Sequence, residues 1–309
     1  MNGNRDEKRR PSPLLQNAKF GDPGLRIYLD NLSAQMEMTT TFTLMALAVW
    51  AATSGASRLL GKHQRVKEVL EQVSQGAIGI AADMATIQSV GLAERHLLPQ
   101  LARRGWLISP GVPWDEPVAL LAIQRKDGLD AVEAHLLRRL DDEVCRRIVA
   151  SFAKRKSFLD WSATFSKALR AQELGDHELA IPIWLIALDG IIDVEIGIAN
   201  IFSKKYELRR AKMQARLLPG RSFKPLADAW LDVLSAFSQH SGQPNPAVLS
   251  RHAILHGNRP QIGTRKDSVQ GILALEVLHH LLVVADSAKT AGANFGLAAG
   301  LPMLPARLT

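Results

Sequence analysis

LAIPIWLIALDGIIDVEIGIANI, residues 179–201, predicts the most apolar helix of the chain, with apolar side chains on most of its sides. Pro182 stands near the start of that helix, where proline is best tolerated because the first N–H groups have no partner within the helix. A helix that is apolar nearly all round is typical of the centre of a bundle. Asp193 and Glu195 interrupt the apolar surface, and we expect them to form a stripe that faces solvent.

Helical periodicity continues on both sides of this stretch. Apolar residues recur at three- and four-residue steps from Arg26 to about Arg95, and at four-residue steps within Leu129–Arg147. Further helices are expected over residues 152–174, 226–240 and 268–288. No alternating pattern of convincing length predicts a strand, and Leu, Ala and Ile dominate the apolar residues. The sequence therefore predicts an all-α protein built as a helical bundle.

A break in the helical pattern divides the chain. Residues 106–114, WLISPGVPW, contain two prolines and a glycine, which are typical of turns and loops. Residues 1–25 lack periodicity and are expected to form a flexible basic arm. Residues 26–103 are expected to be an N-terminal helical region without an assigned role, 104–290 the bundle domain, and 291–309 a loose tail.

The composition of the chain indicates which partners and which cellular compartment suit it. It has 309 residues, a formal net charge of +8 and a pI near 9.8, so an anionic partner such as nucleic acid suits it. Cys145 is the single cysteine, which excludes an intramolecular disulfide and suits a reducing compartment. The N-terminal residues lack a signal-peptide core, and the most apolar run, residues 42–52, is about half as long as a membrane span. We expect a soluble cytoplasmic protein that does not bind membranes.

Positive charge is concentrated between residues 203 and 224. This segment has eight Lys and Arg residues against one acid, Glu207. Such a run can be an ordinary solvated surface, or it can be an electrostatic track for a polyanion. The residues predicted to bind RNA are Lys204, Lys205, Arg209, Arg210, Lys212 and Arg216.

SRHAILHGN, residues 250–258, places an arginine and two histidines on one short predicted helix. Asn245 and Pro246 are suited to open this helix, and Gly257 is suited to end it. His256 then falls in the last turn, where the helix dipole favours the protonated imidazole. An arginine can neutralise the charge on a pentacoordinate phosphate, and a histidine can move the proton of a 2′-hydroxyl or protonate the leaving 5′-oxygen. RNA supplies the nucleophile, and this chemistry needs no metal or other cofactor.

Two other interpretations of this segment remain open. His252 and His256 are four residues apart, which is the spacing of a two-histidine metal site, although no sequence feature requires one. The histidines that would complete such a site are His279 and His280. The plainer interpretation is structural, with His256 capping its own helix and Arg251 forming an ion pair. The acids that Arg251 would pair with are Asp189 and Glu276.

Arg251-x4-His256 resembles the Arg-x4–6-His signature of the HEPN superfamily, all-helical proteins that are widespread as ribonucleases in bacterial toxin–antitoxin and anti-phage systems. The apolar stretch 179–192 looks like the helix that such proteins place before the motif. Residues 251–257 and 106–110 resemble an uncharacterised bacterial subgroup of the superfamily. The resemblance covers about residues 104–288.

The resemblance implies a HEPN-like bundle whose site forms at a homodimer interface. Arg251 would be the phosphate-binding cation and His256 the catalytic histidine, with His252 in the polar position after the arginine. Asp189 and Asn258 would be supporting residues, Asp189 by orienting Arg251. The implied function is a metal-independent endoribonuclease acting as a toxin or anti-phage effector, with RNA, a second copy, and an antitoxin or regulatory protein as partners. Some superfamily members are inactive, so the alternative is a non-catalytic module that binds a partner or nucleic acid.

Overall fold

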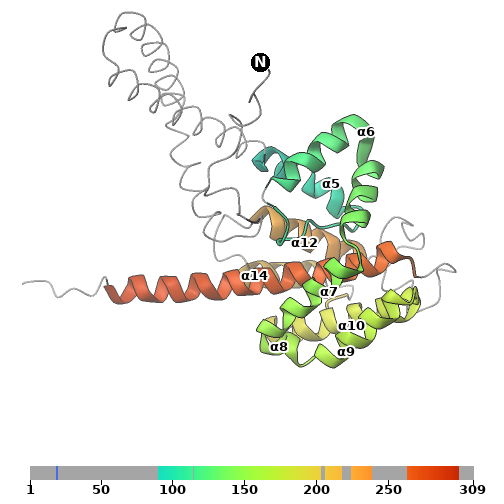
Figure 1. Ribbon diagram of the computed structural model, residues 1–309. Coiled ribbons are helices and arrows are strands. Elements are labelled where there is room, and N and C mark those ends of the chain that lie inside the picture. Colours follow the sequence, from blue (N-terminus) through green and yellow to red (C-terminus); the bar gives the residue numbers. More distant parts are fainter. Residues whose placement is uncertain are drawn as a thin grey trace, which may run out of the picture. The chain divides into compact units, whose positions relative to one another are not determined.

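The computed structural model describes Lys19 and residues 90–113, 115–202, 206–217, 224–238 and 263–298. Within these residues the regular structure is helical (Figure 1), apart from an isolated bridge between Lys19 and Pro113. The prediction of an all-α protein is confirmed for this part of the chain. The described residues divide into two compact units, which we call the N-terminal unit and the C-terminal unit.

The N-terminal unit contains Lys19 and residues 90–97, 108–113 and 115–132. Its helical parts are residues 90–96 and the first part of α6 (Glu116–Arg139), which Gly128 interrupts with a φ of 84°. Residues 98–107 belong to the C-terminal unit together with residues from 133 onward. The expected boundary between residues 103 and 104 stays a prediction.

The core of the C-terminal unit is built around two long helices. α10 (His177–Ile196) packs against α9 (Ser162–Glu173) and α14 (Arg265–Ala298), and α14 also packs against α12 (Lys224–Phe237), as Figure 1 shows. The short helix α5 (Leu98–Ala102) lies on α12. The central position predicted for the stretch from residue 179 is therefore confirmed.

Buried tryptophans join the helices of this core. The Trp184 indole N–H on α10 donates to the Ser268 hydroxyl on α14 at 3.1 Å, and the Trp230 indole N–H on α12 donates to the Ala274 carbonyl at 2.8 Å. Both side chains are fully buried, so each N–H needs the partner that it has. Gly271 lets α14 approach Trp184 closely, because a Cβ atom at position 271 would lie 2.9 Å from the Trp184 Cβ.

The break predicted at residues 106–114 is confirmed, because α5 ends at Ala102 and α6 begins at Glu116. The single helix predicted over 129–147 is wrong: α6 ends at Arg139, and α7 (Asp142–Ser151) starts separately. Asp141 is the N-cap of α7, and its side chain accepts a hydrogen bond from the Val144 N–H at 2.8 Å. An aspartate at this place stabilises a new helix start more than it stabilises a continuous helix.

The single helix predicted over 152–174 is also wrong. The chain instead forms a 3-10 turn, η2 (Phe152–Lys154), the short α8 (Lys156–Leu159) and then α9. The Phe152 ring contacts the rings of Phe158 and Phe165, with centroids 5.2 and 5.4 Å away. Packing of these aromatic side chains outweighs the helical periodicity of the segment.

α10, α12 and α14 start close to where they were expected, but the ends of α10 and α14 differ from the prediction. α10 ends at Ile196 rather than at 201, because Gly197 adopts a left-handed conformation with a φ of 69°. α11 (Tyr206–Leu217) then carries the basic segment. α14 continues to Ala298, past the start of the tail expected at 291.

α14 is also apolar and long enough to cross a membrane over residues Arg265–Ala288. However, 89% of the most apolar part of this helix is buried inside the fold. That burial is consistent with the core helix of a soluble protein.

Candidate functional site

The predicted catalytic residues Arg251, His252 and His256 and the supporting Asn258 lie outside the described residues, as do Lys204 and Lys205. The structure does show how the chain is held on either side of residues 239–262, which contain the Arg251-x4-His256 motif and which we call the motif segment. α12 ends at Phe237 and α14 begins at Arg265, and these two helices pack against each other. Both ends of the segment therefore start from the core of the C-terminal unit.

The residues after the motif segment are fixed at the start of α14. The Thr264 hydroxyl donates to Asp267 at 2.7 Å, and the Asp267 N–H donates back to that hydroxyl at 3.2 Å. This reciprocal arrangement satisfies N–H groups at the helix start. Gly263, with a φ of 102°, lies against the first turn of α10, since a Cβ there would be 2.8 Å from the Glu178 nitrogen. The Thr264-x-x-Asp267 pattern is the sequence signal from which this cap could have been predicted.

Arg265 adds a second anchor beside this cap. Its guanidinium donates to the carbonyl oxygens of Leu137 and Leu140 at 2.9 and 2.7 Å, and it lies 3.3 Å from the Asp142 carboxylate. The cation thus satisfies carbonyl groups at the C-terminal end of α6. The start of α14 is held by two other elements of the C-terminal unit.

Asp189, predicted to orient Arg251, has a structural partner. Its Oδ1 accepts a hydrogen bond from the Ile201 N–H at 2.8 Å. This contact ties the chain that follows α10 back onto the helix. The expected contact between Asp189 and Arg251 involves a residue outside the described part of the chain, and it stays a prediction.

The cations of α11 that were predicted to bind RNA contact groups of the fold. Arg210 lies 2.8 Å from the Asp232 carboxylate on α12, and the Lys212 ammonium donates to the Gly197 carbonyl at 2.7 Å. The excess of positive charge seen in the sequence is therefore compensated in space at Arg210. Lys212 binds a carbonyl at the C-terminal end of α10, where a cation is favoured by the helix dipole.

Arg209 and Arg216 are partly buried on the same helix. The Arg209 Nη1 is buried and has no hydrogen-bond partner within the described residues. Arg216 binds Asp286 of α14 at 3.0 Å. The structure therefore does not line up the four described cations as one open basic face.

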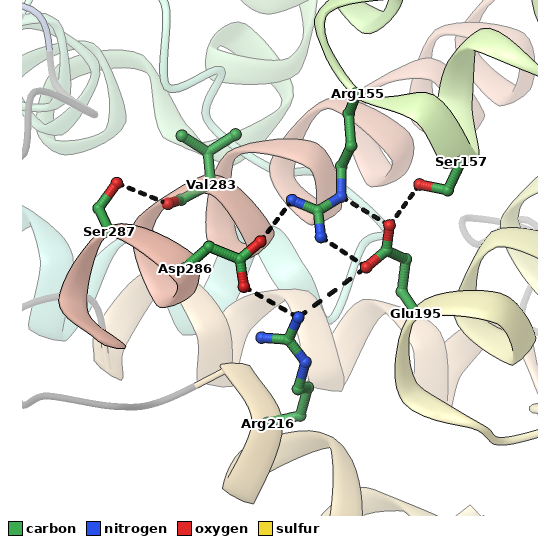
Figure 2. Close-up of polar contacts among 7 residues, drawn as sticks. All are labelled: Arg155, Ser157, Glu195, Arg216, Val283, Asp286 and Ser287. Carbon is green, nitrogen blue, oxygen red and sulfur yellow. Dashed lines mark hydrogen bonds and ion pairs between the residues drawn. The ribbon is translucent and has the colours of Figure 1, made fainter. Parts of the chain in front are cut away.

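Arg216 belongs to a group of four charged residues, which we call the four-charge cluster (Figure 2). Arg155 contacts Glu195 at two points, Nε to Oε1 at 2.7 Å and Nη2 to Oε2 at 2.5 Å. The Arg155 Nη1 also donates to Asp286 at 2.8 Å. Arg216 closes the ring, 3.0 Å from Asp286 and 3.9 Å from Glu195. The Ser157 hydroxyl donates to Glu195 as well.

The two arginines stabilise the ionised forms of the two acids. Hydrogen bonds from Arg155 lower the pKa of Glu195 despite its burial. Burial would raise the pKa of Asp286, but hydrogen bonds from Arg155 and Arg216 outweigh it and lower that pKa. Because two cations face two anions, the cluster carries no net charge. It joins the end of α10, α11 and α14 to the residues between η2 and α8.

The solvent-facing stripe expected for Asp193 and Glu195 is half correct. Asp193 is exposed, whereas only 13% of the Glu195 side chain is exposed. The residues are two positions apart, so they point to different sides of the helix. Arg155 and Glu195 are 40 residues apart in the sequence, and no local pattern predicts that they pair.

His279 on α14 lies in an apolar environment. Its ring centroid is 5.0 Å from that of Phe158 and 5.8 Å from that of Phe152. Burial, together with the nearby charges of Arg155 and Lys154, lowers the pKa of His279 to about 4. Its Nε2 is buried without a hydrogen-bond partner in the described part of the chain. The ring is therefore neutral at physiological pH.

The described residues contain no group of three or more His, Cys, Asp or Glu placed to hold a metal ion, and the metal-site alternative stays an open prediction. His252 and His256 lie outside that region. Cys145 is buried, and this burial raises the pKa of its thiol to about 11. A thiol with such a pKa is a poor nucleophile.

Comparison with known proteins adds no family to these observations. A scan against protein-family models, a search of curated proteins and a search of solved structures found no match to this chain.

Proposed function

We propose that this protein is a metal-independent endoribonuclease that cleaves RNA by attack of the 2′-hydroxyl. The observation that carries the proposal is the Arg251-x4-His256 motif. The described structure supports it in one respect: the motif segment connects two packed helices, α12 and α14, of an all-α unit. Such a placement gives the segment a rigid base from which to present side chains.

In the proposed reaction the 2′-oxygen bonds to phosphorus and the bond from phosphorus to the 5′-oxygen breaks. The products are a 2′,3′-cyclic phosphate and a 5′-hydroxyl. His256 moves the proton of the 2′-hydroxyl or protonates the leaving oxygen, and Arg251 neutralises the charge that builds on the phosphate. Two copies of the motif facing each other across a two-fold axis would pool two arginines and two histidines.

The proposal extends to the setting of the protein. We place it in the cytoplasm as a homodimer that binds RNA, acting as a toxin or anti-phage effector under the control of an antitoxin or regulatory protein. The single cysteine and the net charge of +8 suit a reducing compartment and a polyanionic partner.

A second candidate function is a non-catalytic helical module that binds a partner. Two observations favour it. Arg210, Lys212 and Arg216 contact groups of the fold, so less of the basic segment is left for RNA. α10 also exposes apolar side chains, including Ile186 and Val194, that no described residue covers.

Cleavage assays with matched variants separate the two functions. We would incubate structured and unstructured RNA in EDTA with wild type, Arg251→Ala, His256→Ala and, as a control, His96→Ala, whose histidine is exposed on the helix at residues 90–96. The ribonuclease predicts cleavage by wild type and His96→Ala alone, with cyclic-phosphate ends. Equal cleavage by His256→Ala would overturn the site, and loss of wild-type activity in EDTA would overturn the metal-free mechanism. Folded proteins without activity on any RNA would favour the binding module.

A further inference from the structure

α10 is apolar nearly all round, but the fold does not cover all of it. Leu179, Ile186 and Val194 are 55%, 50% and 74% exposed. These residues are seven and eight positions apart, which places them on one side of the helix over about four turns. Ile183, half-buried, lies on the same side. We call these four residues the α10 stripe.

The gap in the stripe between Ile186 and Val194 is also apolar. The Trp161 ring lies over Gly190 so closely that a Cβ atom there would be 2.7 Å from the Trp161 Cζ2. Trp161 is half-buried, so part of the indole remains accessible beside the stripe. The apolar surface therefore continues along the length of α10. Extended apolar surface of this kind is typical of interaction sites.

One edge of the stripe is acidic. Glu178 and Asp193 are exposed, and Asp189 is half-buried. By helical spacing these three carboxylates fall within a sector of about 60° on one side of α10. Negative charge along this edge disfavours RNA, whose phosphates it would repel.

The same edge decides against a second copy docked in antiparallel fashion. In antiparallel packing about a two-fold axis, each helix sets the same edge against its partner, so acidic residues would meet acidic residues. Glu178 of one copy would approach Asp193 of the other. A partner with basic residues along its edge would instead gain ion pairs at both positions.

We propose that the α10 stripe docks an amphipathic helix from a partner protein. Its aliphatic residues, spaced three and four apart, would lie on Leu179, Ile186 and Val194. Its Lys and Arg residues would lie along the edge formed by Glu178 and Asp193. This mode of binding, a helix laid by its apolar face onto an apolar surface, needs no rearrangement of α10. The inference rests on α10 and the neighbouring Trp161, and it stands whether or not the chain cleaves RNA.

Synthetic peptides test the proposal on the full-length protein. One probe is a helical peptide as long as α10 with Leu at three- and four-residue spacing and Lys elsewhere, and the other has Glu in place of Lys. We expect the Lys peptide to bind wild type and the Glu peptide to bind at least about tenfold more weakly, a difference of about 1.4 kcal/mol. Added salt should lower the affinity of the Lys peptide for the protein, because ion pairs contribute to its binding.

Variants then locate the binding surface. Ile186→Ser and Val194→Ser should each lower the affinity for the Lys peptide several-fold. Asp193→Lys should reverse the preference, so that the Glu peptide binds more tightly than the Lys peptide. Val283→Ser, at an exposed apolar residue on α14, is the matched control and should change nothing. Because Val194 is largely exposed, its substitution leaves the fold intact even if Ile186→Ser disturbs it.

Three results would overturn the proposal. They are the absence of binding by either peptide, equal affinity for both peptides, and affinity for the Lys peptide that Asp193→Lys and Val194→Ser leave unchanged. Sedimentation of the unmixed protein provides a separate check. A dimer that Val194→Ser converts to a monomer would show that a second copy, and not a basic helix, covers the stripe.

Discussion

Arg155 and Glu195 form a two-point ion pair, with Nε–Oε1 and Nη2–Oε2 distances of 2.7 and 2.5 Å, that fastens the start of α8 to the end of α10. Both side chains are largely buried, with 16% and 13% of their surfaces exposed. A buried charge is costly to leave without its partner, so the pair is a sensitive point of the C-terminal unit.

Arg155→Ala should therefore lower the free energy of unfolding by about 3 kcal/mol, because it leaves Glu195 buried without its main cation. Urea denaturation measures this change. The control is Arg146→Ala, whose exposed pairs with Glu143 and Glu173 should contribute less than about 1 kcal/mol. Equal losses in the two variants would show that the four-charge cluster contributes no more than a surface pair.

His279 should make the protein sensitive to mild acid. Its pKa is about 4 in the folded chain against an ordinary value of 6.5. The unfolded chain thus binds a proton to this histidine at higher pH than the folded chain does. The contribution of neutral His279 to the free energy of unfolding is therefore fully present above pH 6.5, and it is lost as the pH falls toward 4. We expect a loss of about 2 kcal/mol over this range, after allowing for the partial exposure of the ring.

His279→Phe should reduce that loss, because a phenyl ring can pack on Phe152 and Phe158 and has no proton to bind. Thermal unfolding followed at pH 7 and pH 4.5 for both proteins checks this. A wild-type loss that persists in full in the variant would assign the acid sensitivity to other groups.

Gly271→Ala should destabilise the packing of α14 on α10. The added Cβ would lie 2.9 Å from the Cβ of Trp184, which cannot move aside without shifting its helix. We expect a cost of about 1–3 kcal/mol, as for other overpacked cores. Gly91→Ala is the control, since its Cβ meets nothing closer than 4.0 Å and should be neutral or slightly stabilising. Equal stability of both variants would mean that the contact between α10 and α14 is looser than the structure shows.

The basic segment should separate into residues that bind RNA and residues that hold the fold. Replacing Lys204 and Lys205 together by Ala should weaken RNA binding. It should also make the fall of log affinity with log salt concentration less steep, by up to about 0.7 for each phosphate contact that is lost. Arg216→Ala should lower the free energy of unfolding by about 1 kcal/mol, since Asp286 keeps Arg155 as a partner. Lys167→Ala, at an exposed cation on α9, is the control for RNA binding. An unchanged salt slope in the double variant would contradict the predicted RNA track.

The sequence predicted the helical class and the central place of α10. Both follow from patterns within one segment, namely the helical periodicity and the all-round apolar character of residues 179–196. It missed the end of α10 because Ile198 and Ile201 prolong the apolar pattern beyond the left-handed Gly197. It also missed the four-charge cluster, since Arg155, Glu195 and Asp286 are brought together only by the packing of separate helices. Spacing within one segment carries no information on such pairs.

The chemistry proposed for the motif segment depends on one histidine. The most direct measurement is the single-turnover rate of RNA cleavage in EDTA by wild type and by His256→Ala, with both proteins shown to be folded. We predict that wild type cleaves and leaves 2′,3′-cyclic phosphate ends, and that the variant is slower by about 10²–10⁴-fold, the usual contribution of general acid–base catalysis. Cleavage by the variant at the wild-type rate would contradict the assignment of His256.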